Sequence, residues 1–407
     1  MLVEGIVIDS KTKEPLPFAS VGIRNTFIGT ATNSTGRFVF TVPATMSDST
    51  LVCSFMGYKN HMMPLKKVKN PMTIAMVSDV ITLKEVEVRP WQPWDYVRNA
   101  MQKLRVNYPE NAYMSQGYYS EYIQENGVFL KFTEGVVETY NPRYGDTLDS
   151  QSRALEARRG DDLGQLQFMR DKLDKKLEKE KKKAIKNGEA PDEDDAESID
   201  EAILSASFGG PKTMISIDPL RDTASYLDEK HMKKYKYFIE GYTRFHNQPI
   251  IIIGFESKGV YEHQRQEGEI YISLTSDAIV SIRYDSEIVI PGIARPVIFF
   301  AGYGITNPTL SGVVHYKPIN NRWYLSDISV EGGTRISDTK LFKKDDRSTF
   351  HIEMALINSS FDITNVHQIP EKDRIDEDKP LEEQVEPDPE FWKTYKVSRP
   401  VNLVKEE

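Results

Sequence analysis

The stretch from Tyr113 to Tyr140, YMSQGYYSEYIQENGVFLKFTEGVVETY, carries the clearest structural signal in the chain. Two long runs that resemble β-strands in composition, Tyr113–Gln124 and Val128–Tyr140, are joined by Glu125-Asn126-Gly127. Asn-Gly between two such runs is a strong hairpin signal, because both residues accept the positive φ angles of a tight turn. The stretch therefore predicts a long antiparallel hairpin.

The tyrosines of this hairpin allow two interpretations. They stand at Tyr113, Tyr118, Tyr119, Tyr122 and Tyr140. Grouped aromatic rings on a sheet are able to form a platform for a sugar or a peptide. The interpretation that we favour is that they are amphipathic strand residues whose hydroxyl groups reach water.

A helix is predicted immediately before the hairpin. Val97, Ala100, Met101 and Leu104 recur at spacings of three and four residues, which places one apolar stripe along three to four turns. Asn107-Tyr108-Pro109 should end this helix, because the residue before a proline is disfavoured in the α conformation.

Residues 235–356 return to β-like patterns and predict one large sheet. Within residues 279–285, Val280, Ile282 and Tyr284 alternate with polar residues, as expected for a strand with one buried face. The short turns leave no room for parallel crossovers, so we expect a curved antiparallel sheet or half-barrel. The runs are 235–242, 250–255, 269–274, 279–290, 297–300, 313–316, 323–330 and 349–356.

Two charged segments flank this region. Between Arg170 and Lys183, twelve of fourteen side chains are charged, within a predicted helical insertion at about 150–202. Its lysines alternate with acids, which favours a solvated arm over a basic patch. Residues 368–390 carry a net charge of −7 and predict an acidic tail (368–407), whose aromatic segment around Phe391 and Trp392 should dock on the body.

The first ninety residues contain short strands separated by turns, at 3–8, 18–23, 38–42, 51–55 and 72–76. Evenly spaced runs of this kind predict an antiparallel β-sandwich. We therefore divide the chain into a sandwich (1–90), a helix and half-barrel domain with the charged insertion (91–367), and the tail.

Composition excludes several classes of protein. The length of 407 residues predicts two or three domains at ~150 residues each. A net charge of −9 argues against general nucleic-acid binding, and no apolar run is long enough for a transmembrane helix. The one cysteine, Cys53, excludes an internal disulfide and a multi-cysteine metal site. Because it lies inside an apolar run, we interpret it as a buried apolar residue rather than a nucleophile.

The N-terminal region resembles the carboxypeptidase-regulatory-like domain, which is widespread in cell-envelope proteins of the Bacteroidetes. The resemblance implies a transthyretin-like sandwich of seven strands that is itself non-catalytic, in an exported protein. The segments that carry it are Gly5–Asp9, Glu14–Val21, Gly29–Asn33, Gly36–Phe38 and Ser54–Tyr58.

A shorter motif, Gly268–Ile272 followed by Thr275–Ile279, resembles the half-barrel of outer-membrane lipoprotein carriers. This resemblance implies a concave sheet face that holds an acyl chain or another apolar ligand. The alternative, which we favour, is that helices over 97–104 and 199–234 fill that face as core.

No catalytic, cofactor-binding or metal-binding residue is singled out by the sequence, and we expect no cofactor. A zinc carboxypeptidase would need a His-x-x-Glu pair, and no histidine has a glutamate three residues later. No two histidines lie three to five residues apart, so we interpret them as scattered. The histidines are His61, His231, His246, His263, His315, His351 and His367.

The leading hypothesis is a mainly β, non-catalytic binding or assembly module of the envelope, periplasmic or outer-membrane associated. Its partner would be an unknown envelope protein. The alternatives are a carrier of a lipid or other apolar ligand, and a hydrolase that uses carboxylates. The residues after Met1 resemble no export signal, so the protein is either cytosolic or a chain whose signal has been removed. The family resemblance favours the second interpretation.

Overall fold

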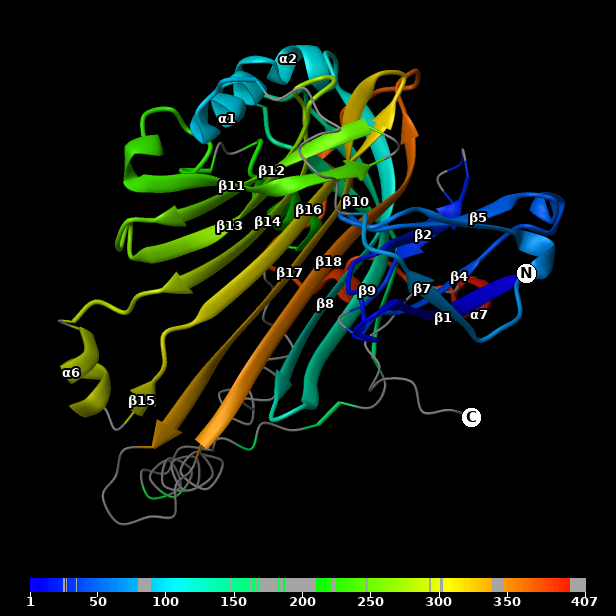
Figure 1. Cartoon of the computed structure of the whole chain (residues 1–407). Coiled ribbons are helices and arrows are strands. Elements are labelled where there is room, and N and C mark those ends of the chain that lie inside the picture. Colours follow the sequence, from blue (N-terminus) through cyan, green and yellow to red (C-terminus); the bar gives the residue numbers. More distant parts are fainter. Residues whose placement is uncertain are drawn as a thin grey trace.

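The protein, described here as a computed structural model, consists of a small β-sandwich and a much larger antiparallel sheet (Figure 1). The structure describes residues 1–79, 89–160 and 210–395, apart from 25, 27, 34, 147, 222–223, 246–247, 293, 301–302 and 339–346, together with 163, 164, 167, 182 and 186. The predicted mainly β fold is confirmed.

Within residues 1–79, the described part of the sandwich, the structure has seven strands, the number that the family resemblance implied. One sheet has the order β4-β1-β7 and the other β3-β2-β5-β6, with buried residues such as Val7 and Leu51 between them. One pair, β1 with β7, is parallel, so the prediction of a wholly antiparallel sandwich was wrong. The strands are β1 (Leu2–Asp9), β2 (Ser20–Ile23), β3 (Gly29–Ala31), β4 (Arg37–Thr41), β5 (Thr50–Ser54), β6 (His61–Pro64) and β7 (Met72–Met76). The 3₁₀ turns η1 (Ala44–Met46) and η2 (Leu65–Lys67) connect some of them.

The large sheet has the order β10-β9-β8-β18-β17-β16-β14-β13-β12-β11, and β15 pairs with β17. All its pairs are antiparallel, and the predicted hairpin of β8 and β9 closes through Asn126 and Gly127, which have φ angles of 52° and 85°. Its strands are β8 (Tyr113–Glu125), β9 (Val128–Asn141), β10 (Gln151–Arg159), β11 (Tyr235–Phe245), β12 (Gln248–Ser257), β13 (Gln264–Ser273), β14 (Ile279–Ile288), β15 (Tyr303–Ile305), β16 (Thr309–Ile319), β17 (Arg322–Asp338) and β18 (Arg347–Asp362).

One face of this sheet, which we call the core face, is apolar from strand to strand. Strand pairing places a single row of buried residues across seven strands, and every member is at most 1% exposed. The row consists of Ile253, Ile270, Ile282, Val314, Ile328, Leu356 and Tyr119. Burial of this continuous surface is the main apolar contribution to the stability of the large sheet.

Helices and a turn-rich segment cover the core face. The predicted helix is confirmed as α1 (Pro93–Gln102), which buries Tyr96, Val97 and Ala100 and is followed by α2 (Leu104–Asn107). Proline begins α1, and the side chains of Gln92 and Asp95 form a reciprocal capping box. Residues 214–232, which include part of α5 (Gly210–Ser216), pack into the same cluster of buried residues. In the described ranges, no helix is long and apolar enough to cross a membrane.

Three local predictions were wrong. Residues 151–159, assigned to the helical insertion, form strand β10, because Arg153 and Arg158 pair with Glu138 and Glu134 of the neighbouring strand. Most of the remaining insertion, and the predicted helix at 199–206, lie outside the described residues. The described part of 222–234 consists of turns that end in a 3₁₀ helix, η4 (Met232–Lys234). The predicted strand at 297–300 lies in helix α6 (Ala294–Phe300).

The acidic segment after β18 lies along the edge of the large sheet beside β10. Leu381 packs into the core cluster, and the ring of Trp392 lies under the guanidinium of Arg158, 4.2 Å from the ring centre. Its short elements are η5 (Glu371–Asp373), η6 (Leu381–Glu383) and α7 (Pro389–Thr394).

Candidate functional site

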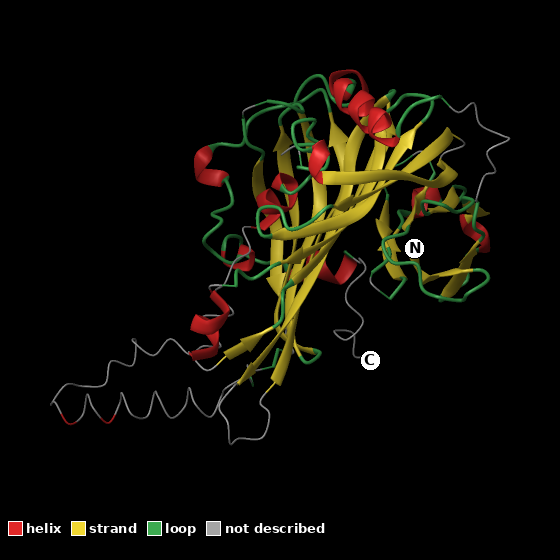
Figure 2. Ribbon diagram, turned by 60° about the vertical axis from the view of Figure 1, so that its left-hand side comes forward, coloured by secondary structure: helices red, strands yellow, loops and turns green. Residues whose placement is uncertain are grey.

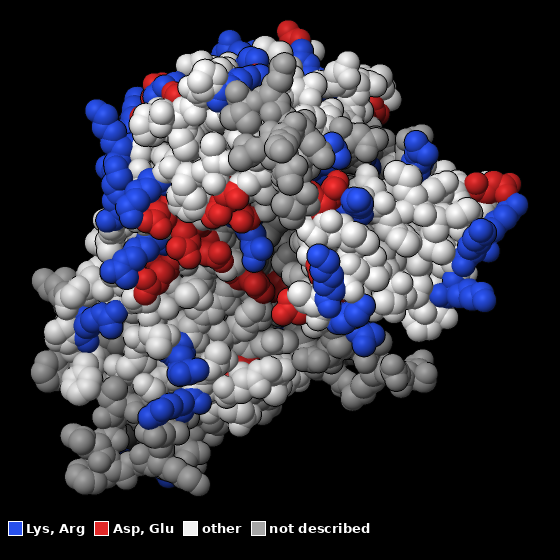
Figure 3. All heavy atoms as spheres, in the orientation of Figure 1, with Lys and Arg blue, Asp and Glu red and all other residues white. Residues whose placement is uncertain are grey.

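The second face of the large sheet, which we call the opposite face, carries a row of acidic residues. Glu331 of β17 pairs with Glu353 of β18, and the same row continues through Ser311 to Asp285 and Glu267. Each of these positions lies three residues from a member of the core-face row, and odd spacings in a strand alternate between faces. Figure 3 shows the acidic side chains gathered in the middle of the molecule, beside the sandwich.

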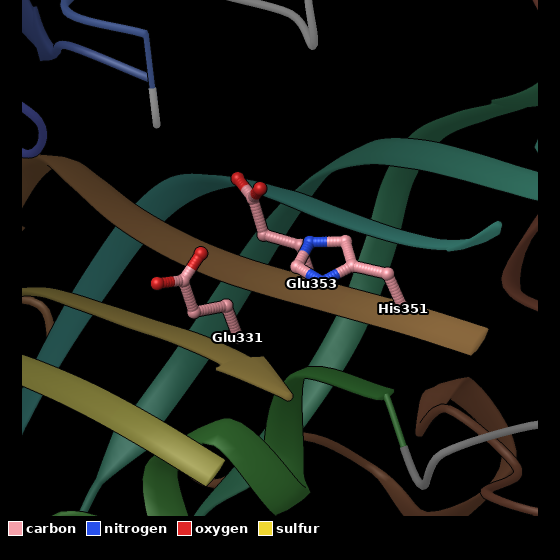
Figure 4. Close-up of side chains that lie close together, drawn as sticks. All are labelled: Glu331, His351 and Glu353. Carbon is pink, nitrogen blue, oxygen red and sulfur yellow. The ribbon is translucent and has the colours of Figure 1, made fainter. Parts of the chain in front are cut away.

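Three side chains of this face converge into a compact cluster (Figure 4). Glu331, His351 and Glu353 each place one nitrogen or oxygen atom within 4.8 Å of the others. His351 and Glu353 are two residues apart in β18, so the strand places both on one face, and Glu331 lies directly across from Glu353. Imidazole nitrogen and carboxylate oxygen are ligands for divalent metals. The structure therefore contains a potential metal centre in a position that only strand pairing creates.

Glu353 lies in an electrostatic environment unlike that of a surface acid. It is 7% exposed, and this burial raises the pKa of its carboxyl to about 7. The negative charge of Glu331 raises this pKa further. The hydroxyl of Tyr122, which donates a hydrogen bond to Glu353, lowers it. Burial and the carboxylate of Glu353 raise the pKa of the Tyr122 hydroxyl. A carboxyl with a pKa near neutrality is able to donate a proton as well as to bind a cation.

A hollow of about 490 Å³ adjoins the cluster. Glu331 and His351 form part of its wall, and Gly332 and Gly333 lie beside them in β17. A Cβ atom on Gly333 would lie 2.8 Å from the carbonyl oxygen of Phe350, so only glycine fits here without a shift of β18. The remaining wall consists largely of hydroxyl and amide side chains, such as those of Thr306, Asn307, Thr309 and Thr349. The surface in front of the cluster is therefore polar and open to small ligands.

A larger cleft of about 910 Å³ separates the sandwich from the large sheet. The sandwich contributes residues of β2, β3, β5 and β6, and the sheet contributes residues of β11, β16, β17 and β18. Figure 2 shows the two units side by side, with the sandwich next to the large sheet. Lys317 bridges them through a 3.0 Å hydrogen bond from Nζ to the carbonyl oxygen of Thr26, and Thr243 donates to the carbonyl oxygen of Asp79 at 3.0 Å.

Charged groups from both units line this interdomain cleft. His315 contacts Asp327 at 2.7 Å between Nδ1 and Oδ1, on the wall formed by the large sheet. Burial lowers the pKa of Lys317, while Asp327 acts in the opposite direction. The basic residues of the lining outnumber the acidic ones. They are Arg24, Lys59, Arg244 and Lys317, against Asp79 and Asp327.

The structure places Cys53 and most of the hairpin tyrosines in the interior of the protein. Cys53 is fully buried in the sandwich, and burial raises the pKa of its thiol to about 12, which agrees with an unreactive apolar residue. The expectation that the hairpin tyrosines reach water was wrong for Tyr113, Tyr118, Tyr119 and Tyr122, which are at most 4% exposed. The last three donate hydrogen bonds to buried glutamates. The platform hypothesis also loses its basis, because buried rings offer no binding surface.

The histidine prediction illustrates what the sequence search missed. Ligand spacings of three to five residues suit helices and hairpin turns, whereas this cluster has the strand spacing His351-x-Glu353. A glutamate two residues after a histidine in a predicted strand was the available signal. The contribution of Glu331 had no signal, because it depends on the register between β17 and β18.

Comparison with known proteins supports the N-terminal assignment. Residues 3–88 match the family model of the CarboxypepD_reg-like domain, so the resemblance inferred from sequence is confirmed. This domain is non-catalytic, and the match covers the sandwich rather than the large sheet. A search of the curated proteins gives no match.

Three solved structures are similar to this chain at low identity. A DUF1329 family protein from Desulfovibrio piger has 11% identity and a TM-score of 0.21, over 68% of this chain and 93% of its own. A lipovitellin structure has 9% identity and a TM-score of 0.24, over 67% of this chain and 27% of its own. A putative membrane-associated protein of unknown function from Bacteroides fragilis has 8% identity and a TM-score of 0.15, over 89% of this chain and 98% of its own.

Proposed function

We propose that the protein is a non-catalytic binding module of the cell envelope, periplasmic or outer-membrane associated, that holds its ligand in the interdomain cleft. The observation that carries this proposal is the cleft, about 910 Å³ between two units that have separate hydrophobic cores. Its volume is within the ~300–1,000 Å³ typical of ligand sites, which often form between domains. The carboxypeptidase-regulatory-like domain supports both the binding role and the location.

The charge of the cleft favours an anionic occupant. The lining contains four basic side chains and two acidic ones, and one of the acids, Asp327, contacts His315. Complementary charge speeds encounter with a partner and excludes ligands of like charge. We therefore propose an acidic segment of another envelope protein as the ligand.

A carrier of apolar ligands is less well supported by the packing. The core face, which such a carrier would need to keep open, is covered by α1, α2 and residues 214–232 in one continuous hydrophobic cluster. Opening a cavity there would expose residues such as Ile282 and Leu356, which are at most 1% exposed. The filling of this face by α1, α2 and the turn-rich residues 214–232 supports a binding module over a carrier.

Site-specific photo-crosslinking tests the proposed function. A benzophenone amino acid replaces Met62, which lines the cleft and is 50% exposed, and the full chain is irradiated in its native envelope. We expect one discrete covalent adduct. The matched control carries the same amino acid at Ile363, which is also 50% exposed but lies outside the cleft lining. Equal adducts at the two positions, or none at Met62, would refute the cleft as the binding site.

Charge reversal separates specific binding from proximity. Arg24→Glu combined with Lys59→Glu should reduce the adduct at Met62 several-fold, because both exposed cations line the cleft. Lys11→Glu combined with Lys13→Glu makes the same change in net charge at exposed sites of the sandwich outside the lining, and should leave the adduct unchanged. Equal losses in both double variants would indicate a general charge effect and contradict the proposed anionic ligand.

A further inference from the structure

We propose that Glu331, His351 and Glu353 form a binding site for a divalent transition-metal ion, with Zn²⁺ as the best fit. This site goes beyond the proposed function and is independent of it. It shares no lining residue with the interdomain cleft.

The chemistry of the three side chains selects the class of metal. One imidazole nitrogen and two carboxylate oxygens are a donor set that suits Zn²⁺. Ca²⁺ and Mg²⁺ prefer oxygen alone, so the imidazole of His351 would contribute nothing to either ion. The set therefore predicts a preference for Zn²⁺ over Ca²⁺.

The geometry needs only a small adjustment. Ligand atoms at ~2.1 Å from a tetrahedral zinc lie about 3.4 Å from one another. The three atoms of the cluster already lie within 4.8 Å of one another. Side-chain torsions of Glu331 and His351, both partly exposed, are able to make up the difference without movement of the strands.

The cluster also lacks a competing cation. Among the described residues, neither Glu331 nor Glu353 forms an ion pair with lysine or arginine, although the two carboxylates face each other across β17 and β18. Two like charges in this position destabilise the pairing of the strands. A divalent ion between them would relieve that repulsion, which is the reason to expect affinity here and not at every acidic pair.

Tyr122 and the adjoining hollow complete the arrangement. The hydroxyl of Tyr122 donates to Glu353 and orients one ligand, in the way that partners behind a metal ligand commonly do. The hollow of about 490 Å³ leaves the fourth coordination position accessible to water or to an anionic ligand. Three protein ligands with one open position are typical of zinc sites that exchange a ligand.

Calorimetric titration of the full chain with ZnCl₂, after removal of metal with EDTA, tests this proposal. We expect one site per chain, and at least ~100-fold weaker binding in Glu353→Gln and in His351→Ala, since loss of an outer partner alone costs ~10–100-fold. Tyr122→Phe should cost about tenfold. CaCl₂ should bind far more weakly than ZnCl₂ to the wild-type chain.

The matched control is Glu267→Gln, which removes one charge from the same acidic row without touching the cluster. It should bind Zn²⁺ like the wild type. Equal weakening in Glu267→Gln and Glu353→Gln would indicate a diffuse acidic surface and overturn the site. Unchanged binding in His351→Ala would do the same. Circular dichroism of each variant verifies that it is folded, so that loss of binding is not loss of structure.

Discussion

The two faces of the large sheet are built from the same strands, three residues apart, and have opposite physical characters. On β14, Ile282 is fully buried in the core-face row, whereas Asp285 is exposed in the acidic row. On β17, Ile328 and Glu331 repeat this relation. The same register of strand pairing therefore determines both the core-face row and the acidic row. Stability comes from the core face, which leaves the opposite face available for binding.

The largest expected effect comes from breaking the core face. Ile282→Ala should lower the free energy of unfolding of the large sheet by roughly 2–5 kcal/mol, because it removes buried methyl groups and leaves a cavity between Ile270 and Val314. Tryptophan fluorescence during urea denaturation measures it. All four tryptophans lie outside the sandwich, at Trp91, Trp94, Trp323 and Trp392, so this signal reports on the large sheet alone.

The control for this prediction lies on the same strand. Asp285→Ala, on the exposed face, should change the free energy of unfolding by no more than about 0.5 kcal/mol. It loses only one exposed hydrogen bond, from the hydroxyl of Ser311. A comparable loss of unfolding free energy in both variants would contradict the conclusion that the core face, rather than the opposite face, stabilises the sheet.

An intermediate effect is expected where the cover of the core face is anchored. Burial alone would raise the pKa of Asp277, but Lys103 and Arg89, at 2.7 and 2.6 Å, lower it below its usual value. A lowered folded pKa stabilises the protein above the unfolded pKa of ~3.9, and this contribution is lost as the pH falls through the folded pKa. Asp277→Asn should therefore cost about 1–2 kcal/mol at pH 7, measured by urea denaturation, and less at pH 3.

An exposed ion pair of the same region provides the reference for Asp277. Glu110 is 74% exposed and lies 3.2 Å from Arg322, just after α2. Glu110→Gln should have little effect at either pH, because solvent screens the pair. If Asp277→Asn lowered the free energy of unfolding no more than Glu110→Gln does at pH 7, the ion pairs of Asp277 would not stabilise the helices that cover the core face.

The general architecture was predictable because it depends on local patterns. Alternation along residues 279–285 and the Asn126-Gly127 turn are properties of short segments. The turn agrees with the structure, and so do the buried Val280, Ile282 and Tyr284, although Ser281 on the other face is buried as well. Predictions failed where partners on another strand decide the outcome. Residues 151–159 look like a charged helix in isolation, yet their arginines find glutamates on β9. Tyr118 and Tyr122 look amphipathic, yet their hydroxyls find carboxylates in the interior.

The candidate metal site could not be predicted from the sequence, because it too depends on the pairing of separate strands. His351 and Glu353 lie two residues apart on one strand, a spacing that the sequence shows, but Glu331 is twenty residues before His351 along the chain. The register that pairs it with Glu353 is fixed by the core-face row, in which Ile328 pairs with Leu356. A shift of one residue would move every side chain of the strand to the other face. The apolar pattern of the core-face row therefore positions the site, although the sequence around the three site residues does not indicate that they meet.

The smallest expected effect sharpens the comparison, because its sign depends on metal. With EDTA at pH 8, Glu331→Gln should leave the free energy of unfolding unchanged or raise it by ~0.2–1 kcal/mol, since it removes one of two facing carboxylates. With Zn²⁺ in excess, the wild type should become the more stable protein, because only its site retains all three ligands. Urea denaturation under both conditions measures the difference. A loss above about 1 kcal/mol in EDTA would mean that Glu331 supports the fold itself, and the opposite face would no longer be the face available for binding.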